Sequence, residues 1–231
     1  MREGMQTTRF AILGILKRAS DGATIEALAK DLGLATMTVR QHLTILERDG
    51  YVTFRQVRRP LGRPRHVYTI TSAADEVFPK NYALLTERIL DAVRTLEANE
   101  LTGLTNEAKV GLIFQKMADG LAAEHAPRLL ARPLHERIEA VTALLNQEGA
   151  ISEWEGYGER YEIRSFNCPY QRVAETNQQL CDWHRRLLER LIGQPIRLER
   201  CLMSGESMDT YVVQVPSAQV LTYPLADVEM S

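Results

Sequence analysis

Three cysteines in the back half of the chain are the residues best suited to chemistry. They are Cys168, Cys181 and Cys201, separated by twelve and nineteen residues. A cysteine thiolate can act as a nucleophile, a redox group or a metal ligand, whereas a buried thiol behaves as a small hydrophobe. No Cys-x-x-Cys pair, the spacing typical of zinc sites, is present. The residues alone therefore leave structural cysteines and a metal site both open.

The predicted surroundings of the three cysteines differ. Cys168 directly precedes Pro169, which suits the first turn of a helix, and a helix N-terminus favours a thiolate. Cys181 falls in the first turn of the next predicted helix, and Cys201 falls in the strand after it. Packing of that helix on that strand could bring the three thiols together.

A dense group of arginines in the front third suggests a different chemistry. No acidic residue interrupts the stretch from Thr53 to Ala74, which carries Arg55, Arg58, Arg59, Arg63 and Arg65. Residues 1–80 hold 13 basic and 8 acidic side chains, so the front has a formal charge of about +5 and the rest about −7. This asymmetry predicts a polyanionic partner for the front third.

The elements around these arginines form a helix-turn-helix pattern. Apolar residues recur every three to four positions over residues 8–18, 24–32 and 36–48, which predicts three amphipathic helices. Thr24 is suited to cap the second helix and Gly33 to end it. The second and third helices are joined by a short glycine-containing turn, as in helix-turn-helix motifs.

Two strands after the third helix complete a winged helix. Residues 51–57 and 66–71 alternate in polarity, and Arg58–Pro64 between them is a Pro- and Gly-rich turn. Val39 and Leu43 face inward, so the opposite side of the third helix can enter a DNA groove. A solvated helix face is the alternative, but helix order, turn length and strand alternation together favour DNA binding. We expect contacts with double-stranded operator DNA from Thr36, Thr38, Arg40, Gln41, Arg58, Arg59, Arg63 and Arg65.

A further helical pattern connects the two halves of the chain. Its apolar positions have a 3-4-3-4 spacing: Tyr82, Leu85, Ile89, Ala92 and Leu96. This seam could pack on its own domain. However, two DNA readers must be held about 34 Å apart, which favours a homodimer. We therefore expect a DNA-binding domain over 1–75, followed by a connecting or dimerisation helix and linker over 76–104.

The back half alternates helical and strand patterns. Helices are predicted over 107–121, 134–145 and 179–192 and from Pro169, and strands over 151–155, 161–166, 196–203 and 210–215. The pattern predicts an α+β effector domain over 105–231, and hence an α+β protein with an N-terminal winged helix-turn-helix.

Several segments resemble known regulators. LATMTVRQHLTILERDGYV, with RRPLGRPRHVYTIT, resembles ArsR/DeoR-type winged-helix bacterial transcription regulators. NCPYQRVAETNQQLCDWHRRLLERLIG and ERCLMSGES are similar to the effector domain of SufR-type iron-sulfur regulators, a branch of that superfamily. The resemblance implies a homodimeric repressor of genes for iron-sulfur cluster assembly. It also implies a [4Fe-4S] cluster bound by Cys168, Cys181 and Cys201.

The chain departs from that family at the position of a fourth cysteine. Family members often have one about eight residues beyond the third, where this chain has Met208 and Asp209. A cubane cluster needs four ligands, usually thiolates. Asp209 is the candidate fourth ligand, and His184, three residues after Cys181 on the same helix face, is the alternative. A zinc ion and the absence of any metal remain open as well.

Composition and motifs narrow the function classes. The 231 residues are 45% hydrophobic and 25% charged, as in globular proteins. No apolar run reaches about 18 residues and the start lacks a signal-peptide core, so we expect a cytoplasmic protein without a membrane partner. An enzyme with Cys168 as nucleophile and His184 as base would need a third orienting group, and no such motif is present, so we expect no enzyme. The alternative function is a winged-helix regulator that senses an organic ligand in an apolar pocket, with structural cysteines.

Overall fold

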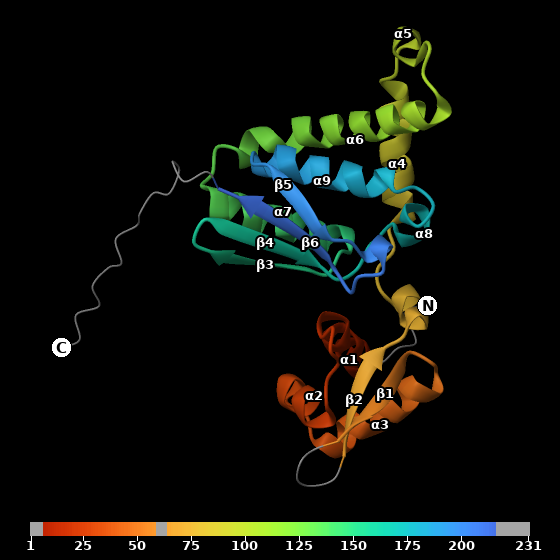
Figure 1. The fold of residues 1–231 in the computed structure, drawn as a ribbon, viewed down its shortest axis with the longest axis vertical. Coiled ribbons are helices and arrows are strands. Elements are labelled where there is room, and N and C mark those ends of the chain that lie inside the picture. Colours follow the sequence, from red (N-terminus) through yellow and green to blue (C-terminus); the bar gives the residue numbers. More distant parts are fainter. Residues whose placement is uncertain (1–6, 59–63, 216–231) are drawn as a thin grey trace, which may run out of the picture. The chain divides into compact units, whose positions relative to one another are not determined.

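The computed structural model describes residues 7–58 and 64–215, which form two compact units (Figure 1). The first unit contains the described residues up to Asn81 together with Phe166–Pro169. The second contains Tyr82–Ser165 and the described residues from Tyr170 onward.

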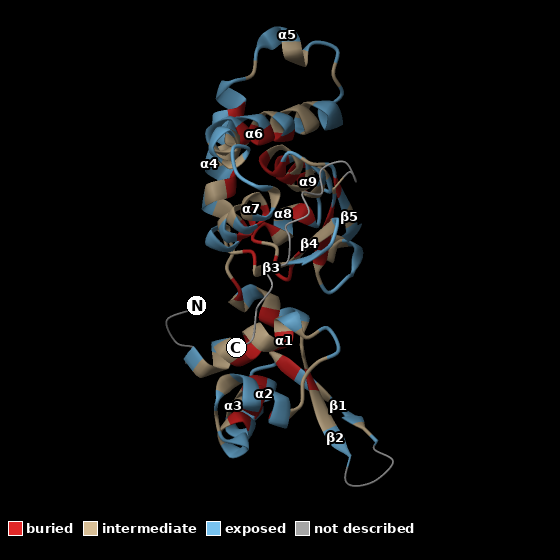
Figure 2. Ribbon diagram, turned by 90° about the vertical axis from the view of Figure 1, so that its left-hand side faces the viewer, coloured by how far each residue is buried: buried red, intermediate tan, exposed pale blue. Residues whose placement is uncertain are grey.

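The first unit is a winged helix-turn-helix, as predicted. Its elements are α1 (Thr7–Arg18), α2 (Ile25–Leu32), α3 (Thr36–Arg48), β1 (Val52–Val57), β2 (Arg65–Ile70) and the 3-10 helix η2 (Ser72–Val77). β1 and β2 pair in antiparallel register, with Val52 opposite Ile70. Each helix contributes one apolar stripe to the core, which appears as the buried interior of this unit in Figure 2.

Local chemistry sets the ends of α2 and the path into it. The Thr24 hydroxyl accepts a hydrogen bond from the Ala27 amide at 3.3 Å, and Gly33 ends the helix with a left-handed φ of 64°. Ala23 pairs with Tyr68 at the edge of the wing. A Cβ on Gly22, whose φ is 79°, would lie 2.4 Å from the Tyr68 carbonyl oxygen, so this close approach requires glycine.

The second unit packs helices on a four-stranded antiparallel sheet, and the predicted α+β class is confirmed. Its helices are α4 (Tyr82–Arg94), α5 (Ala98–Leu101), α6 (Asn106–Leu129), α7 (Leu134–Glu148), α8 (Gln171–Ala174), α9 (Gln179–Ile192) and the 3-10 helix η3 (Leu202–Ser204). Its strands are β3 (Ser152–Tyr157), β4 (Arg160–Ser165), β5 (Ile196–Arg200) and β6 (Asp209–Gln214), in the order β3-β4-β6-β5. The amphipathic helix α9 packs against α6, α7 and β5 (Figure 1).

Three predicted elements differ in extent. The end of the predicted connecting segment 76–104 contains the short helix α5, which a reciprocal capping box with Glu97 and Glu100 stabilises. The helix predicted from Pro169 begins at Gln171 and is a single turn. The strand predicted to reach Met203 ends at Arg200, where η3 follows.

The apolar seam predicted for dimerisation packs largely within its own unit. Leu85 and Ala92 are 3% and 4% exposed, and α4 lies against α6. These two seam positions are therefore buried within the unit itself, whereas Tyr82, Ile89 and Leu96 are half-buried, and the dimerisation role of the helix stays a prediction. A different face of α4 carries Leu90 and Val93, which are 50% and 44% exposed.

A partly buried ion pair joins α4 to α7 in the second unit. Arg88 Nη1 donates to Glu148 Oε2 at 3.0 Å, and the same guanidinium nitrogen donates to the Tyr170 hydroxyl oxygen at 3.0 Å.

Within residues 7–58 and 64–215, the structure has no helix that is both long and apolar enough to cross a membrane.

Candidate nucleic-acid interface and cysteine cluster

The third helix of the winged unit presents the side predicted to read DNA. Val39 and Leu43 are 0% and 1% exposed, because they fill the core between α3 and its neighbours. Arg40 and Gln41 are therefore held on the opposite, exposed side. Thr36 is exposed in the first turn and Thr38 is half-buried, and the large side chain of Met37 is 64% exposed beside them.

The wing places further arginines on the surface of the same unit. Arg58 and Arg65 are exposed at the end of the β1-β2 hairpin where Val57 pairs with Arg65 and the chain passes from β1 to β2. Arg59 and Arg63 lie outside the described residues. Arg55 differs from them because its guanidinium donates a hydrogen bond to the Asp21 carbonyl oxygen at 3.2 Å.

The electrostatics of this unit link the helix and the wing. The backbone amide hydrogen bond at the start of α2 is the main cause that lowers the pKa of Glu26, and the positive charges of Arg65 and Arg40 lower it further. Two arginines from different elements thus act on the same carboxylate. Because Arg40 on α3 and Arg65 on β2 both act on Glu26, they lie on one surface of this unit. Such a surface can contact one stretch of phosphate backbone.

Two of the three cysteines meet in the second unit. Cys181 lies in the first turn of α9, and Cys201 precedes η3 and forms its N-cap position. Their side chains are joined by a hydrogen bond, and the Asp209 side chain at the start of β6 also hydrogen-bonds to Cys201. Cys201 thus has one other thiol and one carboxyl group as side-chain neighbours.

Burial is the largest influence on the pKa values of Cys201 and Asp209. Burial raises the pKa of the Cys201 thiol, and the neighbouring Asp209 charge raises it further. Burial also raises the pKa of Asp209 to about 6, although the Leu202 amide donates to its Oδ1 at 2.8 Å. In the absence of a cation, both groups therefore keep their protons to a higher pH than they would in water. A bound metal would reverse this, because metal ligation favours the deprotonated thiolate.

Cys168 belongs to the first unit, where a lysine lies beside it. Lys80 Nζ donates to the Cys168 carbonyl oxygen at 3.3 Å and to Asn167 Oδ1 at 3.2 Å. Burial lowers the pKa of Lys80, while the charges of Asp75 and Cys168 raise it. A neighbouring ammonium stabilises a thiolate. The predicted helix-dipole contribution is weak, because Cys168 lies two residues before the N-cap Tyr170 of a one-turn helix.

The alternative fourth ligand, His184, has another partner. Its Nδ1 lies 3.0 Å from the Tyr211 hydroxyl, and burial lowers the pKa of its imidazole to about 4. Sequence reasoning could place His184 beside Cys181 on one helix face. The sequence did not predict Tyr211 as the partner of His184, because the two residues are 27 positions apart. It did not predict Lys80 as the partner of Cys168 either, because these two are 88 positions apart.

The residues fit an iron-sulfur cluster by donor type and in part by position. Two thiols converge, and thiolates are the usual ligands of such clusters. Across the described residues, however, no three His, Cys, Asp or Glu side chains are arranged as a group that could hold a metal ion. The predicted set of Cys168, Cys181, Cys201 and Asp209 is therefore not preassembled, and its role as a ligand set stays a prediction.

Comparison with known proteins supports the class of the N-terminal unit. Residues 5–53 match the family model described as winged helix-turn-helix DNA-binding. This match and the observed helices and hairpin define a winged helix-turn-helix DNA-binding domain at the N-terminus, followed by a region of mixed helices and sheet.

Two solved structures have partial similarity to the chain. One is the complex of S. aureus MepR with DNA, at 21% identity, which covers 52% of this chain and 81% of that chain with a TM-score of 0.30. The other is Bacillus subtilis PadR in complex with operator DNA, at 18% identity, which covers 62% of this chain and 91% of that chain with a TM-score of 0.28. Similarity this low does not assign a function. No curated protein matches the sequence significantly.

Proposed function

We propose that this protein is a homodimeric DNA-binding transcription regulator whose operator affinity is controlled by an iron-sulfur cluster. The expected cluster is [4Fe-4S], and the expected targets are genes for cluster assembly, which the protein would repress. The observation that carries the sensor half of the proposal is the meeting of the Cys181 and Cys201 thiols.

The DNA-binding half rests on the geometry of the first unit. The N-terminal end of α3 would enter the major groove, where Arg40 can donate to guanine and Gln41 can pair with adenine. Arg58 and Arg65 would contact phosphates beside it, because both are exposed on the hairpin that follows α3. Base contacts would supply the sequence preference, and the phosphate contacts would supply affinity and orientation.

Dimerisation would use the uncovered face of α4. Leu90 and Val93 are large apolar residues, one helical turn apart, and each is close to half exposed. Winged-helix readers of symmetric operators need a second reader about one DNA turn away, so this proposal assigns the face to a second copy of the chain. Burying it would remove exposed apolar surface from water.

The cluster would be held by Cys168, Cys181 and Cys201, with Asp209 as the fourth ligand. It would supply a redox-sensitive and oxygen-sensitive link between segments that are otherwise distant in the sequence. Cys181 lies in α9 and Cys201 directly precedes η3, while Cys168 lies between β4 and α8. Loss of the link would remove this restraint and shift the population of DNA-competent molecules.

The test measures operator affinity with and without the metal. DNA fragments selected from a random library by oxygen-free protein would be titrated, by fluorescence anisotropy, with the same protein before and after iron chelation. We expect a change in affinity of about five- to 150-fold, the usual range of allosteric coupling. Equal affinities of metal-loaded and metal-free protein would contradict the sensor half, and failure to enrich any sequence would contradict the DNA-binding half.

A further inference from the structure

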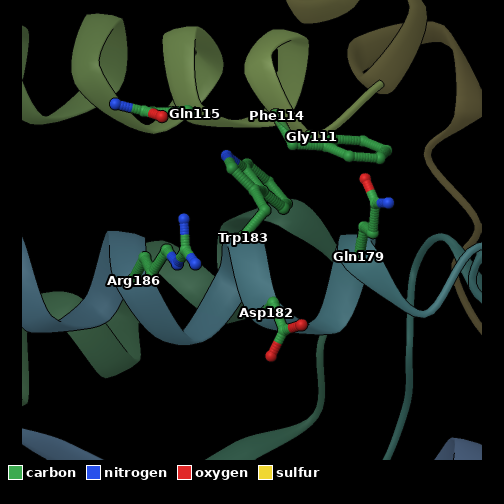
Figure 3. Close-up of a pocket in the computed structure, with 7 residues that line it drawn as sticks. All are labelled: Gly111, Phe114, Gln115, Gln179, Asp182, Trp183 and Arg186. Atoms are coloured by element: carbon green, nitrogen blue, oxygen red, sulfur yellow. The ribbon is translucent and has the colours of Figure 1, made fainter. Parts of the chain in front are cut away.

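A pocket lies between α6 and α9 in the second unit, apart from the cysteine pair. It has a volume of about 110 Å³ and is lined by Gly111, Phe114, Gln115, Gln179, Asp182, Trp183 and Arg186 (Figure 3). The lining residues of α9 are spaced at three and four positions, so they form one face of that helix. Neither the DNA-binding surface nor the proposed cluster uses them.

A buried hydrogen-bond donor in this pocket has no partner. Trp183 is 2% exposed, and its indole Nε1 donates no hydrogen bond to any described residue. Figure 3 shows the indole standing between α9 and α6, with Nε1 directed toward α6. Leaving a buried N–H unpaired is unfavourable, so a ligand that accepts this hydrogen bond would gain from it.

A buried acceptor lies in the same pocket. Gln179 Nε2 donates to the Glu107 carbonyl oxygen at 3.2 Å, which fixes the amide and directs Oε1 into the site. That oxygen is buried and has no hydrogen-bond donor among the described residues. A Cβ on Gly111 would lie 3.3 Å from Oε1, so the glycine leaves room beside this acceptor.

The charges at the rim favour an anionic group near the indole. In Figure 3 the Arg186 guanidinium extends from α9 toward α6, whereas the Asp182 carboxylate points away from α6. Arg186 is exposed and therefore lies where the pocket opens. A carboxylate can accept from an indole N–H and a guanidinium together, and hydrogen bonds of this charged kind are the stronger ones.

We propose that the α6-α9 pocket binds a small carboxylate that also carries a hydroxyl or amino group. The carboxylate accepts from Trp183 Nε1 and Arg186, and the second group donates to Gln179 Oε1. The volume limits the ligand, since a cavity of about 150 Å³ holds one benzene molecule. Molecules of about four to six heavy atoms fit, and nucleotides do not.

The test uses lactate and alanine as probes and propionate as the matched compound that lacks the second group. The chain has two tryptophans, Trp154 and Trp183. A Trp154→Phe variant therefore reports on Trp183 alone. At constant ionic strength, we expect lactate or alanine to change its fluorescence saturably, and propionate to bind about tenfold more weakly. Calorimetry on the unsubstituted protein gives the same comparison if the Trp154→Phe variant is unstable.

Substitutions locate the binding site. Arg186→Gln should weaken binding by about tenfold, because a charged hydrogen bond is lost. Gly111→Ala should also weaken it by crowding Gln179 Oε1. Arg128→Gln, in the last turn of α6 and outside the pocket lining, should leave it unchanged. The proposal is overturned if neither lactate nor alanine gives a saturable response up to about 10 mM, or if all three variants bind alike. Neither result bears on the proposed cluster, because the readout needs neither DNA nor metal.

Discussion

The Tyr211 hydroxyl and His184 Nδ1 lie 3.0 Å apart, and this contact aligns α9 with β6. Tyr211 and Asp209 are two residues apart on one strand, so their side chains leave the same face of the sheet. His184 and Cys181 are three residues apart on one helix, so they too share a face. The packing of α9 beside β6 therefore places Tyr211 next to His184. It also places Asp209 next to Cys201, which interacts with Cys181.

The His184 contact predicts a pH dependence of stability. Burial lowers the pKa of His184 from 6.5 to about 4, so the unfolded chain takes up this proton at a higher pH than the folded chain. The associated stability is present above about pH 6.5 and is lost as the pH falls toward about 4. We expect a loss on the order of 2 kcal/mol across this window in metal-free protein. In His184→Gln, which cannot titrate, urea unfolding at several pH values should show a smaller loss. An identical pH profile in the two proteins would contradict this assignment.

Recognition by α3 predicts a specific cost for Arg40→Ala. If Arg40 pairs with a base, operator affinity should fall by about 1 to 3 kcal/mol, while affinity for unrelated DNA should change much less. Arg48→Ala is the matched control, because Arg48 lies at the other end of α3 and pairs with Asp49 at 3.0 Å. Anisotropy titrations on both DNA types measure the difference. Unchanged operator affinity in Arg40→Ala would rule out α3 as the reading helix at this position.

The wing should contribute through charge rather than sequence. Arg65→Ala should reduce the slope of log affinity against log salt concentration by about 0.9, which corresponds to one phosphate contact. Arg55→Ala serves as the control on the same hairpin, since its guanidinium already donates to the Asp21 carbonyl oxygen. The measurement is operator binding at four or more salt concentrations. Equal slopes for the Arg65→Ala variant and the unsubstituted protein would exclude the wing contact.

The uncovered face of α4 predicts the oligomeric state. A Leu90→Glu, Val93→Glu double variant should convert a dimer to a monomer, because it places two charges in an apolar interface. Ala83→Glu introduces a charge at an exposed position in the first turn of the same helix and should remain dimeric. Light scattering after size-exclusion chromatography measures the mass. A double variant that stays dimeric would show that the copies associate elsewhere.

The sequence predicts the winged unit more fully than the effector unit for a physical reason. Its helices are defined by local signals, such as the Thr24 cap, the Gly33 terminator and the inward stripe of Val39 and Leu43, and all of these are observed. Contacts between distant segments have no local signal. The packing of α4 on α6 depends on tertiary structure, and so does the pairing of Arg88 with Glu148. Apolar periodicity shows that α4 has a face to bury, but it does not show whether α6 or a second copy buries it.

The cysteine site shows the same division. The first-turn position of Cys181 could be read from helical periodicity. Its contact with Cys201 depends on where β5 ends and η3 begins, which the strand pattern placed three residues too late, at Met203 instead of Arg200. The orphaned Nε1 of Trp183 has no sequence signal at all, because a tryptophan on an apolar helix face normally indicates core packing.

Iron and sulfide analysis and a visible spectrum of protein purified without oxygen would show whether the cysteines hold an iron-sulfur cluster. Cys181→Ser and Cys201→Ser are the test variants, and Ser204→Ala in η3 is the control. We expect a brown protein with about four irons per cluster and broad absorbance near about 400 nm. Both cysteine variants should lose this colour, and the control should keep it. Colourless, iron-free protein, even after reconstitution with iron and sulfide, would rule out the iron-sulfur sensor and leave a winged-helix DNA-binding protein with structural cysteines.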